Sequence, residues 1–443
     1  MNIKIPEYAL RAVRVLESAG FSAYFVGGCV RDSLLGNPPA DWDIATNALP
    51  EQVKAAFRGY TVVDTGLKHG TVTVVSDYHN LEITTYRIDG DYSDSRRPDS
   101  VIFTADLHED LKRRDFTVNA MAYHPEQGLV DDWGGKRDLK EKVLRCVGDP
   151  EQRFKEDALR ILRGLRFAAV LGFSIEPKTE TALRQKRGLL SNISGERIRE
   201  ELVKLLFGEN VQQVLLTYRS ILGEVLPEIR PAFDFDQKNP HHYLTVWEHT
   251  VQAIANSIPS VRVRLALLFH DLGKPASFSL DEKGIGHFYG HPELSEQAAR
   301  EIMHRLHFDN ATISRVTALV RYHDCDIVPQ SKSVKRWLNR LGEEGFRELL
   351  AVKAADRSAT THKYENLSVL QLIENILNEV LAQNQCFTRE QLKINGSDLM
   401  DLGIPQGKEI GRILDELLAL VIDEKLPNQP ALLKKRADAL WRR

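Results

Sequence analysis

The alternation of apolar and polar residues changes character along the chain. In the first 145 residues, short runs rich in β-branched and aromatic residues alternate with helical patterns, such as residues 7–20, which end at Gly20. From residue 151 onward the strand pattern disappears, and helical periodicity interrupted by Gly and Pro continues to the last residue. Three runs in the first region are predicted strands: residues 23–28 (AYFVGG), 71–77 (TVTVVSD) and 81–87 (LEITTYR). The pattern predicts an α+β head, with a mixed sheet and helices, followed by all-α domains.

The length of 443 residues exceeds what one hydrophobic core usually organises, so several domains are expected. The polar stretches at 233–243 and 381–392 are candidate boundaries. Together with the end of the strand pattern, they predict a head (1–145), a neck (146–232), a third helical domain (233–380) and a tail (381–443).

Composition narrows the environment and the partners of the protein. A formal net charge of -3 means that any contact with nucleic acid must use a local basic face. The four cysteines show no CxxC spacing, which is typical of reduced thiols in a cytoplasmic protein. The N-terminal residues carry no apolar signal-peptide core, and no apolar run approaches the ~18 residues of a membrane span. No membrane partner is therefore expected.

Two aspartates stand one residue apart in residues 25–46 (FVGGCVRDSLLGNPPADWDIAT). On a strand, alternate residues point to the same face, so Asp41 and Asp43 could direct two carboxylates to one point. Such a pair is unfavourable unless a cation neutralises it, and Mg²⁺ prefers carboxylate and phosphate oxygens. Mg²⁺ at this position would suit phosphoryl transfer. The alternative is a solvated turn after Pro38 and Pro39.

A phosphate contact is predicted upstream of the aspartates. The glycine pair that includes Gly28 would let backbone N–H groups approach a phosphate closely, and Arg31 would add a forked donor. A tight turn with a surface arginine is the alternative.

Taken together, residues 25–46 resemble a motif of the class II nucleotidyltransferases of the polymerase-β superfamily, specifically the bacterial CCA-adding tRNA nucleotidyltransferases. Four further strings are similar to family motifs and follow in the family's order: residues 65–74 (TGLKHGTVTV), 86–103 (YRIDGDYSDSRRPDSVIF), 109–123 (EDLKRRDFTVNAMAY) and 149–173 (DPEQRFKEDALRILRGLRFAAVLGF). The resemblance covers residues from about 25 to 200. It implies Mg-dependent addition of CCA to the 3′ end of tRNA from CTP and ATP, without a template and with no DNA partner.

The strings at residues 109–123 and 149–173 supply candidate nucleotide contacts. The resemblance implies that Arg114 contacts the triphosphate, whereas the residues alone favour an N-capping Asp115 beside exposed arginines. Glu82, on the predicted strand 81–87, could be a third carboxylate near the metal, or an exposed strand residue.

A helix is predicted over EDALRILRGLRF, and it would place Asp157 and Arg160 on one face. A carboxylate and a guanidinium together match the amine and acceptor edges of cytosine and adenine, but not those of guanine and uracil. The resemblance assigns this role to Asp157 and Arg160, and Arg163 and Arg166 continue the row as further nucleotide contacts. The alternative is an ordinary intrahelical ion pair beside a solvated basic stripe.

Related activities provide alternatives to full CCA addition. Poly(A) polymerases share the head motifs but typically add a basic string after the aspartates and a very basic tail, which this chain does not show. Some relatives add only CC or only A. Residues 89–100 (DGDYSDSRRPDS) resemble a flexible element that CC-only relatives tend to lack, which favours the full reaction.

A second constellation lies in residues 233–380 and resembles the HD superfamily of metal phosphohydrolases. Its candidate ligands for a divalent transition metal are His249, His270, Asp271 and Asp356, and His291 and His323 could support a second metal. The resemblance implies a phosphatase or 2′,3′-cyclic phosphodiesterase that acts on small phosphoesters or RNA ends. The metal's identity stays open, and the alternative is a decayed or purely structural domain. Other histidines, His287 among them, are predicted surface residues.

The tail resembles that of HD-containing members of the family. Its last twelve residues (LLKKRADALWRR) could contact tRNA phosphates or form a plain surface helix. The predicted partners are therefore the tRNA 3′ end, CTP and ATP, while the oligomeric state stays open. One hypothesis of a different class remains, namely a phosphohydrolase whose head only binds RNA.

Overall fold

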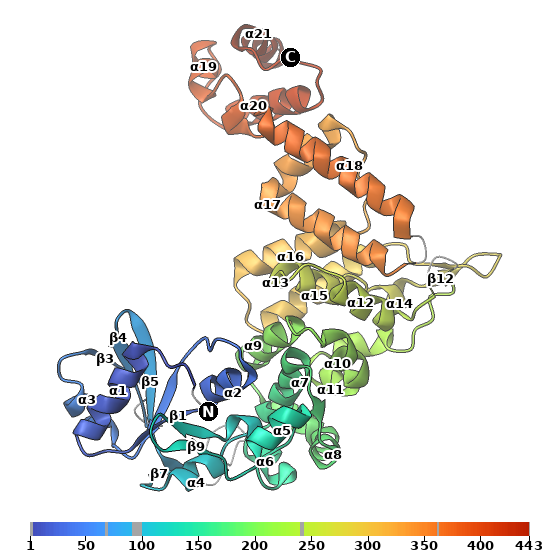
Figure 1. Ribbon diagram of the computed structural model, residues 1–443. Coiled ribbons are helices and arrows are strands. Elements are labelled where there is room, and N and C mark those ends of the chain that lie inside the picture. The colour runs from blue at the N-terminus through green and yellow to red at the C-terminus, as the bar shows by residue number, and fades with distance from the viewer. Residues whose placement is uncertain (1–2, 67–69, 91–99, 240–242, 361–362, 443) are drawn as a thin grey trace. The chain divides into compact units, whose positions relative to one another are not determined.

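The computed structural model describes residues 3–66, 70–90, 100–239, 243–360 and 363–442. Backbone contacts divide the chain into two compact units, Met1–Pro227 (unit 1) and Glu228–Arg443 (unit 2), both visible in Figure 1. The element 89–100 that was compared with CC-only relatives falls mainly on residues 91–99, which lie outside the described residues.

Unit 1 is built on a mixed seven-stranded sheet with strand order β3-β4-β5-β2-β1-β8-β9. β2 and β5 pair in parallel, and this register sets Asp43 directly beside Glu82 on the neighbouring strand. The other adjacent strands of the sheet pair antiparallel. The strands are β1 (Ala23–Val26), β2 (Asp43–Thr46), β3 (Thr61–Gly66), β4 (Thr71–Ser76), β5 (His79–Thr85), β8 (Ala122–His124) and β9 (Gly128–Val130).

The three predicted strands are confirmed as β1, β4 and β5, although their bounds shift: β1 ends two residues early, β4 ends one residue early, and β5 begins and ends two residues early. β1 ends at Val26 because Gly27 adopts a positive φ of 75° and turns the chain into helix α2 (Gly28–Leu35). Several strands were not predicted, including β2, whose sequence DIAT is too short for a clear alternation.

Helices pack beside this sheet and continue into the second half of unit 1 (Figure 1). In the first helix, Ala9, Ala12, Val13 and Leu16 recur at helical spacing and are buried, as the sequence pattern predicts. The helices are α1 (Glu7–Ser18), α2, α3 (Pro50–Ala56), α4 (Leu107–Lys112), α5 (Gly135–Glu141), α6 (Pro150–Glu156), α7 (Leu159–Leu171), α8 (Pro177–Lys186), α9 (Gly195–Leu206), α10 (Val211–Thr217) and α11 (Arg219–Val225).

The prediction that Asp157 and Arg160 share a face of one helix is wrong. α6 ends at Glu156, and Asp157 has extended backbone angles (φ -137°, ψ 103°) between α6 and α7. The Asp157 side chain accepts a hydrogen bond from the N–H of Leu159 at 3.1 Å, so it satisfies the start of α7 instead of continuing α6. Asp157 therefore sits at a break between two helices, and Arg160 lies in the first turn of the second.

Short strands also occur where the sequence pattern predicts helices alone. β10 (Val143–Leu144) pairs in parallel with β11 (Ser174–Ile175), and β12 (Ser279–Leu280) pairs antiparallel with β13 (Gly286–His287). β6 (Arg87–Asp89) and β7 (Val101–Phe103) form a further antiparallel pair in unit 1. Strands of two or three residues are too short to show an alternating pattern, so they could not be predicted from the sequence.

In the part of unit 2 that the structure describes, the secondary structure is helical apart from the β12–β13 hairpin. Its last part has its own apolar core, in which Leu399, Ile413, Leu417 and Leu433 are fully buried. No helix among the described residues combines the length and the apolar character needed to cross a membrane. The helices are α12 (Val246–Ala255), α13 (Val261–Phe269), α14 (Lys274–Ser277), α15 (His291–Arg305), α16 (Asn310–Tyr322), α17 (Ser331–Ser358), α18 (Lys363–Ala382), α19 (Gly396–Asp401), α20 (Lys408–Ile422) and α21 (Pro430–Trp441).

Candidate functional sites

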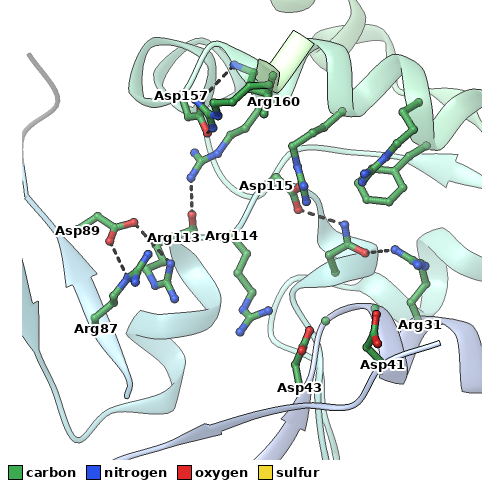
Figure 2. A pocket seen from close by; sticks show the side chains of 18 residues that line it. Arg31, Asp41, Asp43, Arg87, Asp89, Arg113, Arg114, Asp115, Asp157 and Arg160 are labelled. Atoms are coloured by element: carbon green, nitrogen blue, oxygen red, sulfur yellow. Dashed lines mark hydrogen bonds and ion pairs between the residues drawn. The ribbon is translucent and has the colours of Figure 1, made fainter. Parts of the chain in front are cut away.

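A cavity of about 750 Å³ in unit 1 brings together the nucleotide-site residues predicted from the sequence, apart from Glu82, which does not line it. Figure 2 shows Asp41 and Asp43 at one end, Asp157 and Arg160 at the other, and Arg114 between them. The predicted residues that line the cavity are Gly28, Arg31, Asp41, Asp43, Arg114, Asp157, Arg160, Arg163 and Arg166.

The two aspartates share an orientation because the residue between them is anchored in the core. Trp42 is only 4% exposed and packs edge-on against Phe25, with ring centroids 5.1 Å apart. Side chains alternate along an extended segment, so Asp41 and Asp43 both point away from the core and into the cavity. Burial raises the pKa of Asp43 to about 6, and repulsion from Glu82 and Asp41 adds to the effect while Arg114 opposes it. This cluster of carboxylates therefore attracts a cation.

The end of the cavity beside the aspartates is suited to phosphate. α2 begins at Gly28, so its first backbone N–H groups are not used by the helix and can donate to an anion. A Cβ at Gly27 would lie 3.0 Å from Nη1 of Arg114, so only glycine allows this close approach. Arg31 and Arg114 bring two guanidinium groups to the same wall of the cavity.

The neighbouring arginines Arg113 and Arg114 are held by the buried Asp110. Asp110 accepts hydrogen bonds from Arg113 at 2.8 Å and from Arg114 at 3.2 Å. Burial alone would raise the pKa of Asp110, but the two arginines outweigh it and hold the pKa below its usual value. Arg114 is therefore fixed in the cavity wall and is not the exposed residue that the alternative interpretation assumed.

A chain of polar contacts runs from α2 to α7 through the buried Asp115. Arg31 donates to Oδ1 of Asn119 at 2.6 Å, Asn119 donates to Asp115 at 3.2 Å, and Arg163 pairs with Asp115 at 2.5 Å. Burial alone would raise the pKa of Asp115, but Arg163 outweighs this effect and lowers the pKa to about 2. Asp115 thus joins the sheet-bearing half of unit 1 to helix α7.

The far end of the cavity holds an aspartate and an arginine that are each fixed by other partners. Asp157 pairs with Arg197 of α9 at 2.8 Å. Arg160 pairs with Glu156 at 2.8 Å and donates to the carbonyl of Arg113 at 2.8 Å. The two side chains thus present separate polar groups to the same space.

Sequence analysis missed two residues of α9 that support this end. Arg197 lines the cavity, and Glu201 pairs with Arg166 of α7 at 3.2 Å. Arg166 also lies over the ring of Phe167, with its guanidinium carbon 4.1 Å from the ring centroid. Arg197 and Glu201 are four residues apart, so their shared helix face was the one signal that could have indicated them.

Unit 2 contains a second site, in which all six predicted metal-ligand candidates meet. They come from five helices or their ends: α12 carries His249, α13 ends before His270 and Asp271, α15 begins at His291, α16 ends before His323, and α17 carries Asp356. His249, His270 and Asp271 form one group whose ligand atoms lie within 4.8 Å of one another, and Asp271, His291 and His323 form another.

The histidines of this cluster are oriented as metal ligands usually are. The Nδ1 atoms of His270, His291 and His323 lie 2.7–2.8 Å from backbone carbonyls, so these nitrogens act as donors. Their Nε2 atoms face inward, and those of His291 and His323 lie 3.2 Å apart. A carbonyl-bound N–H fixes the tautomer whose other nitrogen can bind a metal, so the donor set fits a divalent transition metal.

Asp271 is common to both groups. Its Oδ2 lies 3.2 Å from Nε2 of His270, and its Oδ1 lies 3.5 Å from Nε2 of His291. Burial alone would lower the pKa of His270, but Asp271 and Asp356 outweigh it and raise the pKa to about 10. Without a metal, the cluster therefore retains a proton that a bound cation would replace.

Known protein families match segments of both unit 1 and unit 2. Residues 23–145 match the family described as Poly A polymerase head domain, residues 172–233 match a probable RNA and SrmB binding site of polymerase A, and residues 278–437 match tRNA nucleotidyltransferase domain 2. A CCA-adding enzyme of Levilactobacillus brevis is 35% identical over 98% of both chains. A crystal structure of the Bacillus stearothermophilus CCA-adding enzyme in complex with CTP superimposes with a TM-score of 0.74 at 29% identity, over 98% of this chain and 97% of that one.

Similarity is higher over part of the chain. A CCA-adding enzyme of Lactobacillus delbrueckii subsp. bulgaricus is 52% identical over 234 residues, which are 52% of this chain and 58% of that protein. This match therefore spans little more than half the length of that relative.

We predict that Asp43→Asn stabilises the protein in the presence of a chelator. The folded pKa of about 6 lies above the unfolded value of 3.8, so this group lowers stability as pH rises from 4 to 6. Urea unfolding at pH 7.5 should show a gain of up to about 3 kcal/mol that vanishes near pH 4. Asp64→Asn, in an exposed pair with Lys54, is the control. A destabilised Asp43→Asn variant at pH 7.5 would contradict this electrostatic description.

We predict the opposite sign for Asp115→Asn. The folded pKa of about 2 lies below the usual 3.8, so Asp115 stabilises the protein above pH 4, and this contribution is lost as pH falls toward 2. Urea unfolding should show a loss of about 2 kcal/mol at pH 7 that becomes smaller below pH 4. Asp77→Asn, which breaks an exposed pair with Arg11, should change little. A loss that is constant with pH would indicate packing and not charge.

Proposed function

Because this chain belongs to the family of CCA-adding enzymes, we propose that unit 1 adds cytidine and adenosine nucleotides from CTP and ATP to the 3′ end of tRNA, without a template. One observation carries the proposal: a single cavity holds a carboxylate pair, phosphate donors and a base-reading pair. In the reaction, the tRNA 3′ oxygen forms a bond to the α-phosphorus of the nucleotide. The bond between the α-phosphorus and the bridging oxygen breaks, and pyrophosphate leaves.

The catalytic residues are Asp41 and Asp43. They would hold Mg²⁺, which would supply activation of the attacking hydroxyl and neutralisation of charge on the leaving phosphates. The raised pKa of Asp43 and the neighbouring Glu82 support this role, because the carboxylates need a cation to coexist above pH 6.

The triphosphate lies along the α2 end of the cavity. Backbone N–H groups at Gly28 and the guanidinium groups of Arg31 and Arg114 bind its oxygens. Arg114 is already fixed by Asp110, so little side-chain freedom is lost when the nucleotide binds.

The base is selected by Asp157 and Arg160. The carboxylate accepts from the exocyclic amine of cytosine or adenine, and the guanidinium donates to the adjacent ring nitrogen or carbonyl. Guanine and uracil present a carbonyl to Asp157 and are repelled. Arg197 acts as a positioning residue for Asp157, while Glu156 and the Arg113 carbonyl position Arg160; Arg163 and Arg166 extend this basic wall.

We propose that unit 2 is a metal-dependent phosphohydrolase of the HD type. His249, His270, Asp271 and Asp356 would hold one divalent transition metal, and His291 and His323 with Asp271 would hold a second. The metal supplies activation of water for attack on phosphorus. The water oxygen forms the new P–O bond, the ester bond breaks, and a proton passes to the leaving hydroxyl. The inward-facing Nε2 atoms support this proposal over a purely structural domain.

The remaining organisation is proposed from the sequence boundaries. The catalytic head is 1–145, the neck that reads the base is 146–232, the HD-type domain is 233–380, and the tail is 381–443, where the basic side chains of the last twelve residues contact tRNA phosphates. The four cysteines are free, three of them buried, which suits a cytoplasmic enzyme.

Extension of tRNA decides between the alternatives for unit 1. With Mg²⁺, CTP and ATP, we expect three additions to tRNA that lacks CCA, two to tRNA ending in C and one to tRNA ending in CC. The double variant Asp41→Asn, Asp43→Asn should lose roughly 10²- to 10³-fold in rate or more, and Asp64→Asn should not. Single-nucleotide gels give the readout.

Each other product pattern has a distinct meaning. A stop after CC would identify a CC-adding enzyme, addition to the CC substrate alone would identify an A-adding enzyme, and a long A ladder would identify a poly(A) polymerase. Undiminished extension by the double variant would refute the metal assignment.

For unit 2, we expect His270→Ala to abolish hydrolysis of bis-p-nitrophenyl phosphate and p-nitrophenyl phosphate while tRNA extension continues. The reason is that His270 is fully buried in the metal cluster of unit 2, whereas nucleotide transfer uses the cavity of unit 1. Assays with Mn²⁺, Co²⁺, Ni²⁺ and Mg²⁺ cover the open metal identity. Wild-type protein without hydrolysis under any of these cations would refute the phosphohydrolase.

A further inference from the structure

Two stacked aromatic rings stand at the rim of the unit 2 cavity. His287 ends strand β13 and Tyr289 follows two residues later. Their ring centroids lie 5.4 Å apart and their planes differ by 5°. Tyr289 is 78% exposed, so its face opposite His287 is open to solvent. Both residues line the same cavity as Asp271, His291 and His323.

The segment that carries this pair is anchored to the histidine cluster. Phe288, between the two rings, packs against Phe235 and Phe278 with centroid distances of 6.4 and 5.7 Å. The Phe288 carbonyl accepts the Nδ1–H of His291 at 2.8 Å. His287 is itself held by Asp281, with Nε2 3.2 Å from Oδ2. The stacked pair is therefore kept at a defined place relative to the metal ligands.

The interior of the cavity has a different character from its rim. Lys274 and Lys353 line it and are 6% and 3% exposed, so two buried cations accompany the metal-ligand cluster. Nζ of Lys274 lies 2.7 Å from Asp271, and Nζ of Lys353 donates to the carbonyl of His323 at 2.6 Å. The same cavity is also lined by Asp271, Glu293, Asp324, Asp326 and Asp356, so an anionic group is favoured inside only when a metal occupies the histidine cluster, while a flat aromatic group is favoured at the rim.

We infer that Tyr289 and His287 form a stacking surface for the nucleobase of a nucleoside phosphate whose phosphate enters the histidine cluster. The inference rests on the phosphohydrolase function proposed for unit 2 and names its specificity residues. Base stacking on aromatic side chains tolerates every base, because each base has a π-face. A cavity of about 640 Å³ has the volume of a small-molecule site and accommodates a mononucleotide.

The test compares two phosphates that differ only in the base. Adenosine 5′-monophosphate and ribose 5-phosphate are measured with full-length wild type, Tyr289→Ala and Tyr289→Phe. Tyr78→Ala is the matched control, because Tyr78 is likewise an exposed tyrosine but lies on the β4–β5 turn of unit 1. Hydrolysis is followed as phosphate release, and calorimetric titration measures binding independently. The nucleotide cavity of unit 1 is unchanged in every variant, so its contribution to binding cancels in the differences.

We expect Tyr289→Ala to lose about tenfold in kcat/KM and in affinity for adenosine 5′-monophosphate, the size expected from loss of one stacking contact. Tyr289→Phe should retain both values, and ribose 5-phosphate should respond equally to all variants. A terminally phosphorylated RNA trinucleotide, added as a third substrate, distinguishes a free nucleotide from an RNA end as the source of the base.

Equal affinity of wild type and Tyr289→Ala for adenosine 5′-monophosphate would overturn the inference. If ribose 5-phosphate were still hydrolysed in that case, the phosphohydrolase would stand without this recognition surface. If no phosphate were hydrolysed but Tyr289→Ala still lost affinity, the surface would stand as a nucleotide-binding site and the hydrolase would fail.

Discussion

The ion pair between the buried Asp115 and the partly exposed Arg163 is the contact on which the nucleotide site depends. It lies where the sheet-bearing half of unit 1 meets helix α7, and Asn119 extends it to Arg31. Asp41, Asp43, Arg31 and Arg114 belong to the first half, whereas Asp157 and Arg160 lie at the start of α7 in the second. Since a charge that loses its partner in the interior is strongly unfavourable, the pair holds the two halves of the cavity together.

The two sites use buried carboxylates in contrasting ways. Asp115 and Asp110 have protein cations beside them, and their pKa values are lowered, so they stabilise structure. Asp43 lies beside two other carboxylates, Glu82 and Asp41, and its pKa is raised. Only a bound cation would neutralise this cluster. In unit 2, Asp271 is shared by two histidine groups, so a cation in one group changes the charge that the other experiences.

Motifs predicted which residues would meet, but the contacts that orient them depended on the tertiary structure. The spacing of Asp41 and Asp43 and the order of the unit 2 histidines led directly to residues that share a cavity. The sequence could not show that Asp157 breaks the helix, because its partner Arg197 lies 40 residues away. His287 was assigned to the surface because a two-residue strand leaves no periodic signal, and nothing in the sequence placed its ring against Tyr289.

The parallel register between β2 and β5 limits the insertions and deletions that these two strands can accept. Asp43 faces Glu82 only while the two strands keep this alignment, and successive residues of a strand point to opposite faces. A one-residue slip of β5 would turn Glu82 toward the other face of the sheet and move Ile83, which is now fully buried, out of the core. Substitutions in this strand can be tolerated one at a time, whereas insertions and deletions belong in the turns at its ends.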